Sequence, residues 1–217
     1  MIVTIDGPAG SGKSTAARRL AERLGFEFLD TGAMYRAVGL KALDSGIDIN
    51  DAERVAHVAE GMEIDAVGPI VRADGRDVTA AIRTPAVTSA ASRVAAIPAV
   101  RSAMVRLQRK AAGNRNVVSE GRDQGTVVFP DAECKFFLTA DANERARRRQ
   151  IELAAQGEQI AFEDLLRQIL ERDTRDETRE TAPLRAAHDA VRIDTSHLSP
   201  DEMVRRMEAV VREKIGG

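Results

Sequence analysis

The segment Gly7-Pro8-Ala9-Gly10-Ser11-Gly12-Lys13-Ser14 constrains the fold of this chain more than any other. It matches the phosphate-binding loop pattern G-x-x-x-x-G-K-[ST] at every fixed position. The β-branched run 2–5 precedes it, and the apolar residues of 15–24 share one helical face. The sequence therefore predicts a strand, a glycine loop and a helix, which is the context in which this pattern marks an anion-binding site.

Each residue type in the loop suits that chemistry. Backbone N–H groups can converge on phosphate oxygens only where side chains are absent and positive φ is allowed, and Gly10 and Gly12 meet both conditions. Lys13 can reach the β- and γ-phosphates, and the Ser14 hydroxyl can ligate Mg²⁺. The predicted site for the nucleotide cofactor ATP consists of Gly7, Pro8, Ala9, Gly10, Ser11, Gly12, Lys13, Ser14 and Thr15.

Composition narrows the partners. The 217 residues carry a formal net charge of −2, so no strong global field favours nucleic acid or an acidic membrane. The sequence has one cysteine, which excludes an intrachain disulfide and favours a reducing compartment. No apolar run is long enough to span a bilayer, and no signal peptide is recognisable. We expect a cytoplasmic monomer that acts on small molecules, with no nucleic-acid or membrane partner.

Beyond the loop, short apolar runs alternate with helical patterns. This alternation predicts an α/β fold with an open parallel five-stranded sheet flanked by helices. Residues 47–61 have a polar helical pattern, and Thr84-Pro85 and Pro98 have the composition of helix starts. After the first strand, the expected core strands are 26–29, 116–120, 135–138 and 190–193.

The periodicity changes in residues 62–83. Met62, Ile64 and Ala66 alternate with other residues, Asp74-Gly75 has the composition of a hairpin turn, and Val78 is expected to begin a third short strand. The sequence predicts a small antiparallel insertion in the parallel core. Such an insertion could be a flap over a second substrate or a hairpin without function.

Arginines gather in a predicted helical hairpin that follows the fourth strand. Asp141 is expected to cap its first helix, which contains four arginines between residues 145 and 149. In the second helix, steps of three and four are expected to place one cluster on a single face. That face could meet anions, or it could be a solvated face balanced by nearby acids. The cluster consists of Arg172, Arg175, Asp176 and Arg179.

Polar side chains also follow two predicted core strands, where α/β proteins place ligand-binding residues. Arg36, shortly after the second strand, could bind a phosphate through its planar fork or be an ordinary solvated arginine. Arg122, after the third strand, could also hold a phosphate. Glu120 or Asp123 could hold Mg²⁺ through water, although a plain ion pair would explain the same pattern.

A phosphate-binding loop alone does not distinguish kinases from switches and motors. A GTPase would need a guanine-reading Asn-Lys-x-Asp segment, and the chain has no Asn-Lys pair. The D-x-x-G match at residues 65–68 lies in the predicted insertion, where it cannot serve a γ-phosphate. A motor would need a longer chain. These exclusions favour a small kinase whose flap and lid close over two phosphorylated ligands and keep out water.

Three further segments closely resemble the bacterial cytidylate kinase family in the same order along the chain. They are residues 30–36 (DTGAMYR), residues 121–132 (GRDQGTVVFPDA) and residues 172–176 (RDTRD). The resemblance implies transfer of the ATP γ-phosphate to CMP or dCMP with Mg²⁺, on an adenylate-kinase-like fold. It implies a core (1–61, 84–140, 188–217), an insertion for the nucleoside monophosphate (62–83) and a helical lid (141–187).

The resemblance also assigns roles to individual positions. It implies that Thr31, Arg36 and Arg122 are acceptor-phosphate ligands. It implies contacts to the ribose hydroxyls from Arg172 and Asp176. Arg145 and Arg149 resemble the lid arginines that meet the transferring phosphoryl group, although any two arginines of 145–149 could serve, and they join Lys13, Arg36 and Arg122 as the catalytic set. The residues expected to read the cytosine edge are Ser92, Arg101, Asp123 and Arg179.

Two alternatives remain open from the sequence. Within the kinase class, the acceptor could be UMP or a metabolite that is not a nucleotide. In another class, a nucleotide-dependent binding or switch protein could hydrolyse ATP slowly. The missing switch motifs disfavour this second reading. The two arginine-bearing segments also disfavour it, because these segments imply a second phosphorylated ligand.

Overall fold

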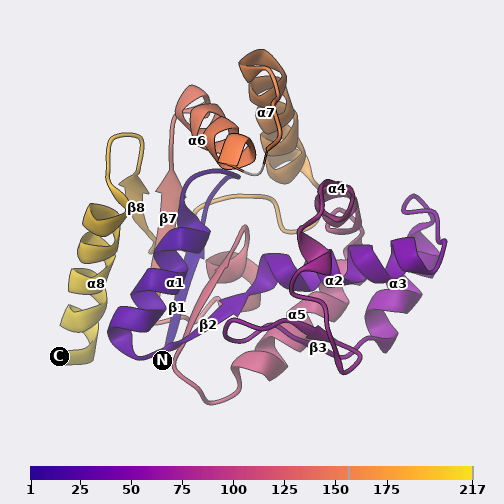
Figure 1. The fold of residues 1–217 in the computed structure, drawn as a ribbon. Helices are drawn as coiled ribbons and strands as arrows, with labels where there is room; N and C mark the ends of the chain where they lie inside the picture. Colours follow the sequence, from indigo (N-terminus) through magenta and orange to yellow (C-terminus); the bar gives the residue numbers. More distant parts are fainter. Residues whose placement is uncertain (156, 217) are drawn as a thin grey trace. The chain divides into compact units, whose positions relative to one another are not determined.

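The computed structural model describes residues 1–155 and 157–216 of the chain (Figure 1). The chain forms two compact units: one comprises Met1–Gly25 and Glu120–Gly217, and the other comprises Phe26–Ser119. The predicted insertion 62–83 belongs to the second unit and the predicted lid 141–187 to the first. Residues 156 and 217, which fall in the predicted lid and core ranges, lie outside the described part.

A five-stranded sheet with the order β2-β6-β1-β7-β8 confirms the predicted fold class. β1 pairs with β7 and β7 with β8 in parallel registers. All five predicted core strands are present, each within one or two residues of its expected bounds. The strands are β1 (Ile2–Asp6), β2 (Glu27–Asp30), β6 (Val117–Gly121), β7 (Cys134–Thr139) and β8 (Val191–Asp194).

In the first unit, helices cover the strands that carry the phosphate-binding loop. Ile5, Phe136 and Leu138 on neighbouring strands are fully or almost fully buried. α1 packs against α8, with Leu20 and Met207 inaccessible to solvent (Figure 1). The helices of this unit are α1 (Lys13–Leu24), α6 (Ala142–Ala155), α7 (Phe162–Thr178) and α8 (Pro200–Gly216), with a π-helical turn at Gln124–Val128.

The arginine-rich hairpin consists of α6 and α7, which lie side by side (Figure 1). Ala146, Leu153, Leu165 and Ile169 form its buried apolar contact. The Asp141 carboxylate accepts hydrogen bonds from the N–H groups that open α6, which confirms the predicted cap. Apolar residues at helical spacing thus join the two helices and leave their polar faces for other contacts.

A capping box opens α8: Glu202 N donates to Ser199 Oγ at 3.3 Å, and Ser199 N donates to the Glu202 carboxylate at 2.9 Å. The expected single face of the second hairpin helix is wrong in part. Arg175 is exposed to solvent. Arg179 lies outside α7, because the helix ends at Thr178.

The second unit is mostly helical. α2 and α4 approach closely because Gly39 presents no side chain, and a Cβ there would lie 3.2 Å from that of Ala90. Thr84 caps α4 with Pro85 at its first position, as predicted. The helices are α2 (Thr31–Asp44), α3 (Ala52–Gly61), α4 (Pro85–Val94) and α5 (Pro98–Ala112), with a 3₁₀ turn at Ala81–Arg83. The helix predicted at 47–61 begins only at α3, where Asp51 caps it.

The insertion of the second unit is antiparallel, as predicted, with the order β3-β4-β5. The strands are β3 (Ile64–Asp65), β4 (Arg72–Ala73) and β5 (Arg76–Asp77). The third strand begins at Arg76 instead of Val78, because Asp74 and Gly75 form a two-residue turn with φ of 50° and 76°. Backbone bonds from Asp30 N to Ala66 O and from Gly68 N to Phe28 O tie the insertion to β2.

No helix in the described part of the chain combines the length and the apolar character needed to cross a membrane.

Candidate active site

The phosphate-binding loop has the backbone that its sequence predicts. Gly10 and Gly12 have φ of 75° and 84°, values that side chains other than glycine rarely allow. Gly12 is also the residue before α1, so the loop leads directly into the N-terminus of that helix. The first turn of α1 therefore directs free N–H groups and a partial positive charge toward the loop.

Lys13 is buried at the start of α1, and its Nζ donates to the Pro8 carbonyl at 2.7 Å. Burial lowers the pKa of Lys13 to about 7, and the positive charges of Arg122 and Arg172 act in the same direction. Glu120 and Asp176 act in the opposite direction. The loop lysine thus lies in a cluster of charged groups that come from β6, the segment after it and α7.

Ser14, the residue after Lys13, and Glu120, whose charge acts on Lys13, form a pair of oxygen-bearing side chains. The Ser14 hydroxyl donates to Glu120 Oε1 at 2.9 Å. Hydroxyl and carboxylate oxygens are the donors that Mg²⁺ prefers, and this ion usually keeps several waters and binds substrate phosphates. The described residues hold no group of three or more His, Cys, Asp and Glu side chains arranged for a metal. A magnesium ion at this pair would therefore depend on phosphate and water ligands.

Asp176 on α7 lies among three arginines of the first unit. Arg122 Nε donates to its Oδ2 at 2.8 Å, and Arg179 Nη1 lies 3.9 Å from its Oδ1. Burial alone would raise the pKa of Asp176, but the Arg122, Arg172 and Arg179 guanidinium groups outweigh burial and hold that pKa below its usual value. The predicted residues Arg122, Arg172, Asp176 and Arg179 therefore form one charged cluster, which also contains Lys13.

Asp6, at the carboxyl end of β1, holds the segment that carries Arg122 and Asp123. Its two carboxylate oxygens accept from Gln124 N and Gly125 N, each at 2.8 Å. Burial raises the pKa of Asp6 to about 7, and the neighbouring Asp123 carboxylate adds to this effect. Asp123 is itself buried. Sequence reasoning missed Asp6, although its position at a strand end was a usable signal.

The two predicted lid arginines have different surroundings. Arg145 is buried, and its guanidinium pairs with Asp173 at 2.6 Å and donates to the carbonyls of Ala9 and Ala140. Arg149 is more exposed and pairs with Glu152 at 2.7 Å on its own helix. Arg145 therefore contacts the backbone of the phosphate-binding loop directly, whereas Arg149 extends toward solvent.

In the second unit, the predicted acceptor-phosphate residues open helix α2. Asp30 caps the helix by accepting from Ala33 N at 2.8 Å, and Arg36 Nη2 lies 3.4 Å from the same carboxylate oxygen. Thr31, the first helical residue, is buried. The cap thus orients Arg36 on the first turns of α2.

Two predicted cytosine-reading residues also belong to the second unit. Arg101 on α5 is buried, donates to the Ala95 carbonyl at 3.1 Å and lies 5.6 Å from the centre of the Tyr35 ring. Ser92 is half-buried on α4. The contact with the ring brings Arg101 to the helix that also carries Thr31 and Arg36.

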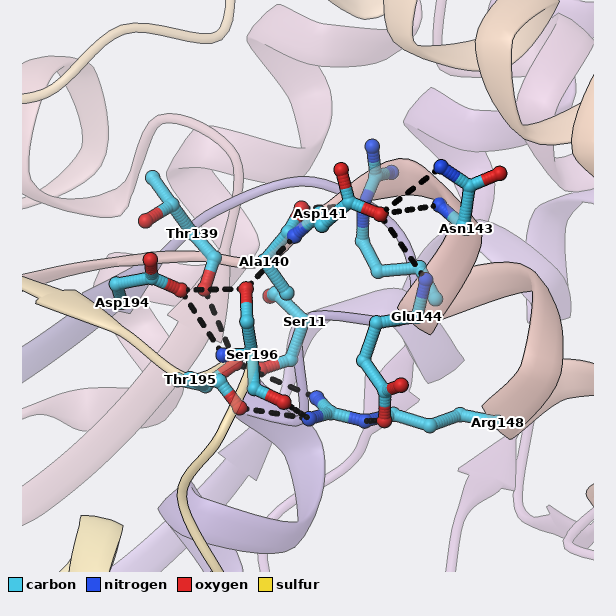
Figure 2. A network of polar contacts seen from close by, with 11 residues as sticks. Ser11, Thr139, Ala140, Asp141, Asn143, Glu144, Arg148, Asp194, Thr195 and Ser196 are labelled. Atoms are coloured by element: carbon cyan, nitrogen blue, oxygen red, sulfur yellow. Dashed lines mark hydrogen bonds and ion pairs between the residues drawn. The ribbon is translucent and has the colours of Figure 1, made fainter.

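A cavity of about 470 Å³ adjoins the phosphate-binding loop within the first unit. Gly12 and Thr15 of the loop and α1 line one side, and Arg148 and Thr195 line another. Figure 2 shows the polar network beside it, in which Arg148 donates to the hydroxyl and carbonyl of Thr195. Sequence reasoning did not select Thr195, although this residue directly follows β8 and is where a parallel sheet places ligand-binding groups.

A phosphate-binding loop on a parallel sheet, with a buried lysine among arginines and acids, defines the class of P-loop kinases and related nucleotide-binding proteins. A solved shikimate kinase from Bacteroides thetaiotaomicron shares the fold, with a TM-score of 0.52 at 11% identity over 98% of each chain. The cytidylate kinase family model matches residues 3–213. This chain belongs to the cytidylate kinase family.

Curated relatives agree along the whole length. The chain is 47% identical to a cytidylate kinase of Caldanaerobacter subterraneus subsp. tengcongensis, over 99% of this chain and 96% of the relative. It is also 47% identical to a cytidylate kinase of Geobacter sulfurreducens, over 99% of this chain and 94% of the relative. The resemblance inferred from three motifs is therefore confirmed.

Proposed function

We propose that this protein transfers the γ-phosphate of ATP to CMP, and to dCMP, to give the nucleoside diphosphate and ADP. The observation that carries the proposal is the charged cluster around Lys13, in a chain of the cytidylate kinase family. Lys13 lies among Arg122, Arg172 and Asp176. A loop lysine suits the polyphosphate of a donor, and guanidinium groups suit the phosphate of an acceptor.

The chemistry needs little beyond positioning and charge stabilisation. A phosphate oxygen of CMP attacks the γ-phosphorus, the bond to the bridging oxygen of ADP breaks, and no general base is required because the attacking oxygen is already anionic. The loop amides and Lys13 hold the donor phosphates, and guanidinium groups stabilise the negative charge on the transferred group. Mg²⁺, held by Ser14 and through water by Glu120, would neutralise charge on the donor phosphates.

The individual roles follow the sequence assignments. Thr31, Arg36 and Arg122 bind the acceptor phosphate, and Arg172 and Asp176 bind its ribose. Arg145 and Arg149 are assigned to the transferring phosphoryl group. The division into core, insertion (62–83) and lid (141–187) is part of the same proposal. The base-reading set is Ser92, Arg101, Asp123 and Arg179.

The proposal also covers the setting of the enzyme. It acts as a monomer on small molecules in the cytoplasm, without a nucleic-acid partner. The near-balanced charge and the single cysteine support this view. Light scattering at assay concentrations tests the monomer: a mass of about twice 23.5 kDa would contradict it.

The first experiment is coupled ADP release with ATP and Mg²⁺ against CMP, dCMP, UMP, AMP and GMP. Strong activity with CMP and dCMP and much lower activity with UMP is expected. Equal activity with CMP and UMP would refute the proposed roles of the base-reading set, while the assignment to the kinase class would stand. A slow ATPase rate that no nucleoside monophosphate changes would contradict the kinase proposal and favour a nucleotide-dependent binding or switch protein.

A variant of the loop lysine distinguishes the activity of this protein from that of a contaminating kinase. Lys13→Ala should lower turnover by at least about 100-fold, because it removes a cation from the donor phosphates. Its circular dichroism should match that of the wild type, because the hydrogen bond of this side chain within the described residues is one to the Pro8 carbonyl. Full turnover in this variant would refute the role of the loop.

A further inference from the structure

Thr195 occupies a buried junction between three parts of the first unit. Its hydroxyl lies 3.0 Å from the Ser11 carbonyl of the phosphate-binding loop and 3.0 Å from the Thr139 carbonyl at the end of β7. Its own N–H donates to that Thr139 carbonyl at 2.8 Å. Only 1% of the residue is exposed. Figure 2 shows these groups converging beside the loop.

The third partner comes from the arginine-rich hairpin. Arg148 on α6 donates through Nη1 to the Thr195 hydroxyl at 3.3 Å and through Nη2 to the Thr195 carbonyl at 2.6 Å. Its Nε pairs with Glu144 at 3.1 Å, which fixes the plane of the guanidinium. The hydroxyl thus accepts from α6 and donates its single proton toward the loop or toward β7.

The contact with Ser11 has a consequence for the loop. A phosphate-binding loop aims its N–H groups at the anion, so its carbonyl groups must point away and need donors elsewhere. Ser11 is fully buried, so water cannot replace a lost donor at low cost. The Thr139 carbonyl already accepts from Thr195 N, so the proton of the Thr195 hydroxyl is available to the Ser11 carbonyl.

We propose that Thr195 is a positioning residue for the donor site: its hydroxyl holds the Ser11 carbonyl and thereby orients the loop amides, and Arg148 couples this contact to helix α6. The inference rests on the proposed binding of ATP at the phosphate-binding loop. Thr195 and Arg148 also line the 470 Å³ cavity beside Gly12, so the junction adjoins the volume next to the loop.

The central test is Thr195→Val, which keeps the shape of the side chain and removes the donor. Its KM for ATP, and its Kd for ATP with Mg²⁺ measured by calorimetry without acceptor, should rise about tenfold, as expected for one buried hydrogen bond. The KM for CMP should stay within about twofold, because the loop orients the donor.

Thr4→Val is the matched control. Thr4 is fully buried on β1 of the same unit, and its hydroxyl makes no hydrogen bond within the described part of the chain. This variant removes a hydroxyl of the same size and burial and should leave the KM for ATP unchanged. An equal rise in both variants would overturn the proposal, because it would reflect a general cost of replacing buried threonine.

A second pair decides the question if Thr195→Val does not fold. Thr195→Ser keeps the hydroxyl, and Thr195→Cys replaces it by a weak donor, while both lack the methyl group. The serine variant should keep the wild-type Kd for ATP within about twofold, and the cysteine variant should bind several-fold more weakly. Equal Kd values in this pair would overturn the proposal.

The outcomes separate this inference from the proposed function. If wild-type protein binds ATP and phosphorylates no monophosphate, the proposed function fails and the Kd measurements still test Thr195. If the Kd for ATP and the KM for CMP rise in parallel with a fall in melting temperature, Thr195 supports the fold in general and the positioning role is wrong.

Discussion

At the scale of single residues, Lys13 lies in a phosphate-binding loop and has a pKa of about 7. A lysine in water titrates at about 10.4, so burial and neighbouring arginines make this side chain much easier to deprotonate. An anionic ligand reverses that effect, because nearby negative charge favours the ammonium form. Binding of a polyphosphate is therefore linked to the protonation of one residue.

We predict that binding of ATP takes up close to one proton at pH 8, and almost none at pH 5.5, where Lys13 is already charged. The sign follows from a low pKa in the free protein and a raised pKa in the complex. Calorimetry in two buffers of different ionisation enthalpy measures the uptake. Lys13→Met should abolish it, and uptake that persists in this variant would assign the proton to another group.

At the scale of secondary structure, two aspartates open consecutive helices of the second unit by the same bond. Asp30 caps α2 by accepting from Ala33 N at 2.8 Å, and Asp51 caps α3 by accepting from Arg54 N at 3.1 Å. The Asp30 carboxylate also lies 3.4 Å from Arg36. Under the proposed role of Arg36, the Asp30 cap would serve both helix stability and acceptor binding, whereas the Asp51 cap would serve helix stability alone.

We predict that Asp30→Ala and Asp51→Ala each lower the free energy of unfolding by about 1 kcal/mol, the usual cost of a lost cap. Asp30→Ala alone should also raise the KM for CMP several-fold, because Arg36 loses the partner that orients it. Urea unfolding and steady-state kinetics measure the two effects. A similar KM change in both variants would show that helix stability, and not the orientation of Arg36, controls acceptor binding.

At the scale of the whole molecule, Asp6 makes stability depend on pH in an unusual direction. Its pKa rises from 3.8 to about 7 in the folded protein, so between these values the folded state binds a proton that the unfolded state does not. The stability from this proton is fully present below pH 3.8 and is lost as the pH rises to 7. The shift corresponds to at most about 4 kcal/mol.

We predict that the free energy of unfolding decreases from pH 4.5 to pH 6.5, and that Asp6→Asn removes most of this slope. The variant should also be less stable throughout, because the asparagine offers one acceptor to the two N–H groups of Gln124 and Gly125. Urea unfolding across the pH range measures both effects. An unchanged slope in Asp6→Asn would assign the pH dependence to other groups.

The sequence by itself determined the features that depend on residues adjacent in the chain. Gly10 and Gly12 specify the positive φ angles of the loop, and apolar periodicity predicts the five core strands and most helices, because these features follow from local sterics and from the face that each element buries. The caps at Asp141 and Thr84 were also readable, since each accepts from an N–H group two or three residues away. Three motifs, together with the phosphate-binding loop, identified the family.

Tertiary structure decided the partner of each charged side chain. Arg145, Arg148 and Arg149 look equivalent in the sequence, yet they pair with Asp173, Thr195 and Glu152, respectively. Glu152 is three residues from Arg149 and within reach of local reasoning, but Asp173 and Thr195 are distant in sequence, so no local pattern reveals them. Burial, which composition does not reveal, also sets the protonation of individual side chains. The buried, water-excluding interior disfavours charge, so it lowers the pKa of Lys13 and raises that of Asp6.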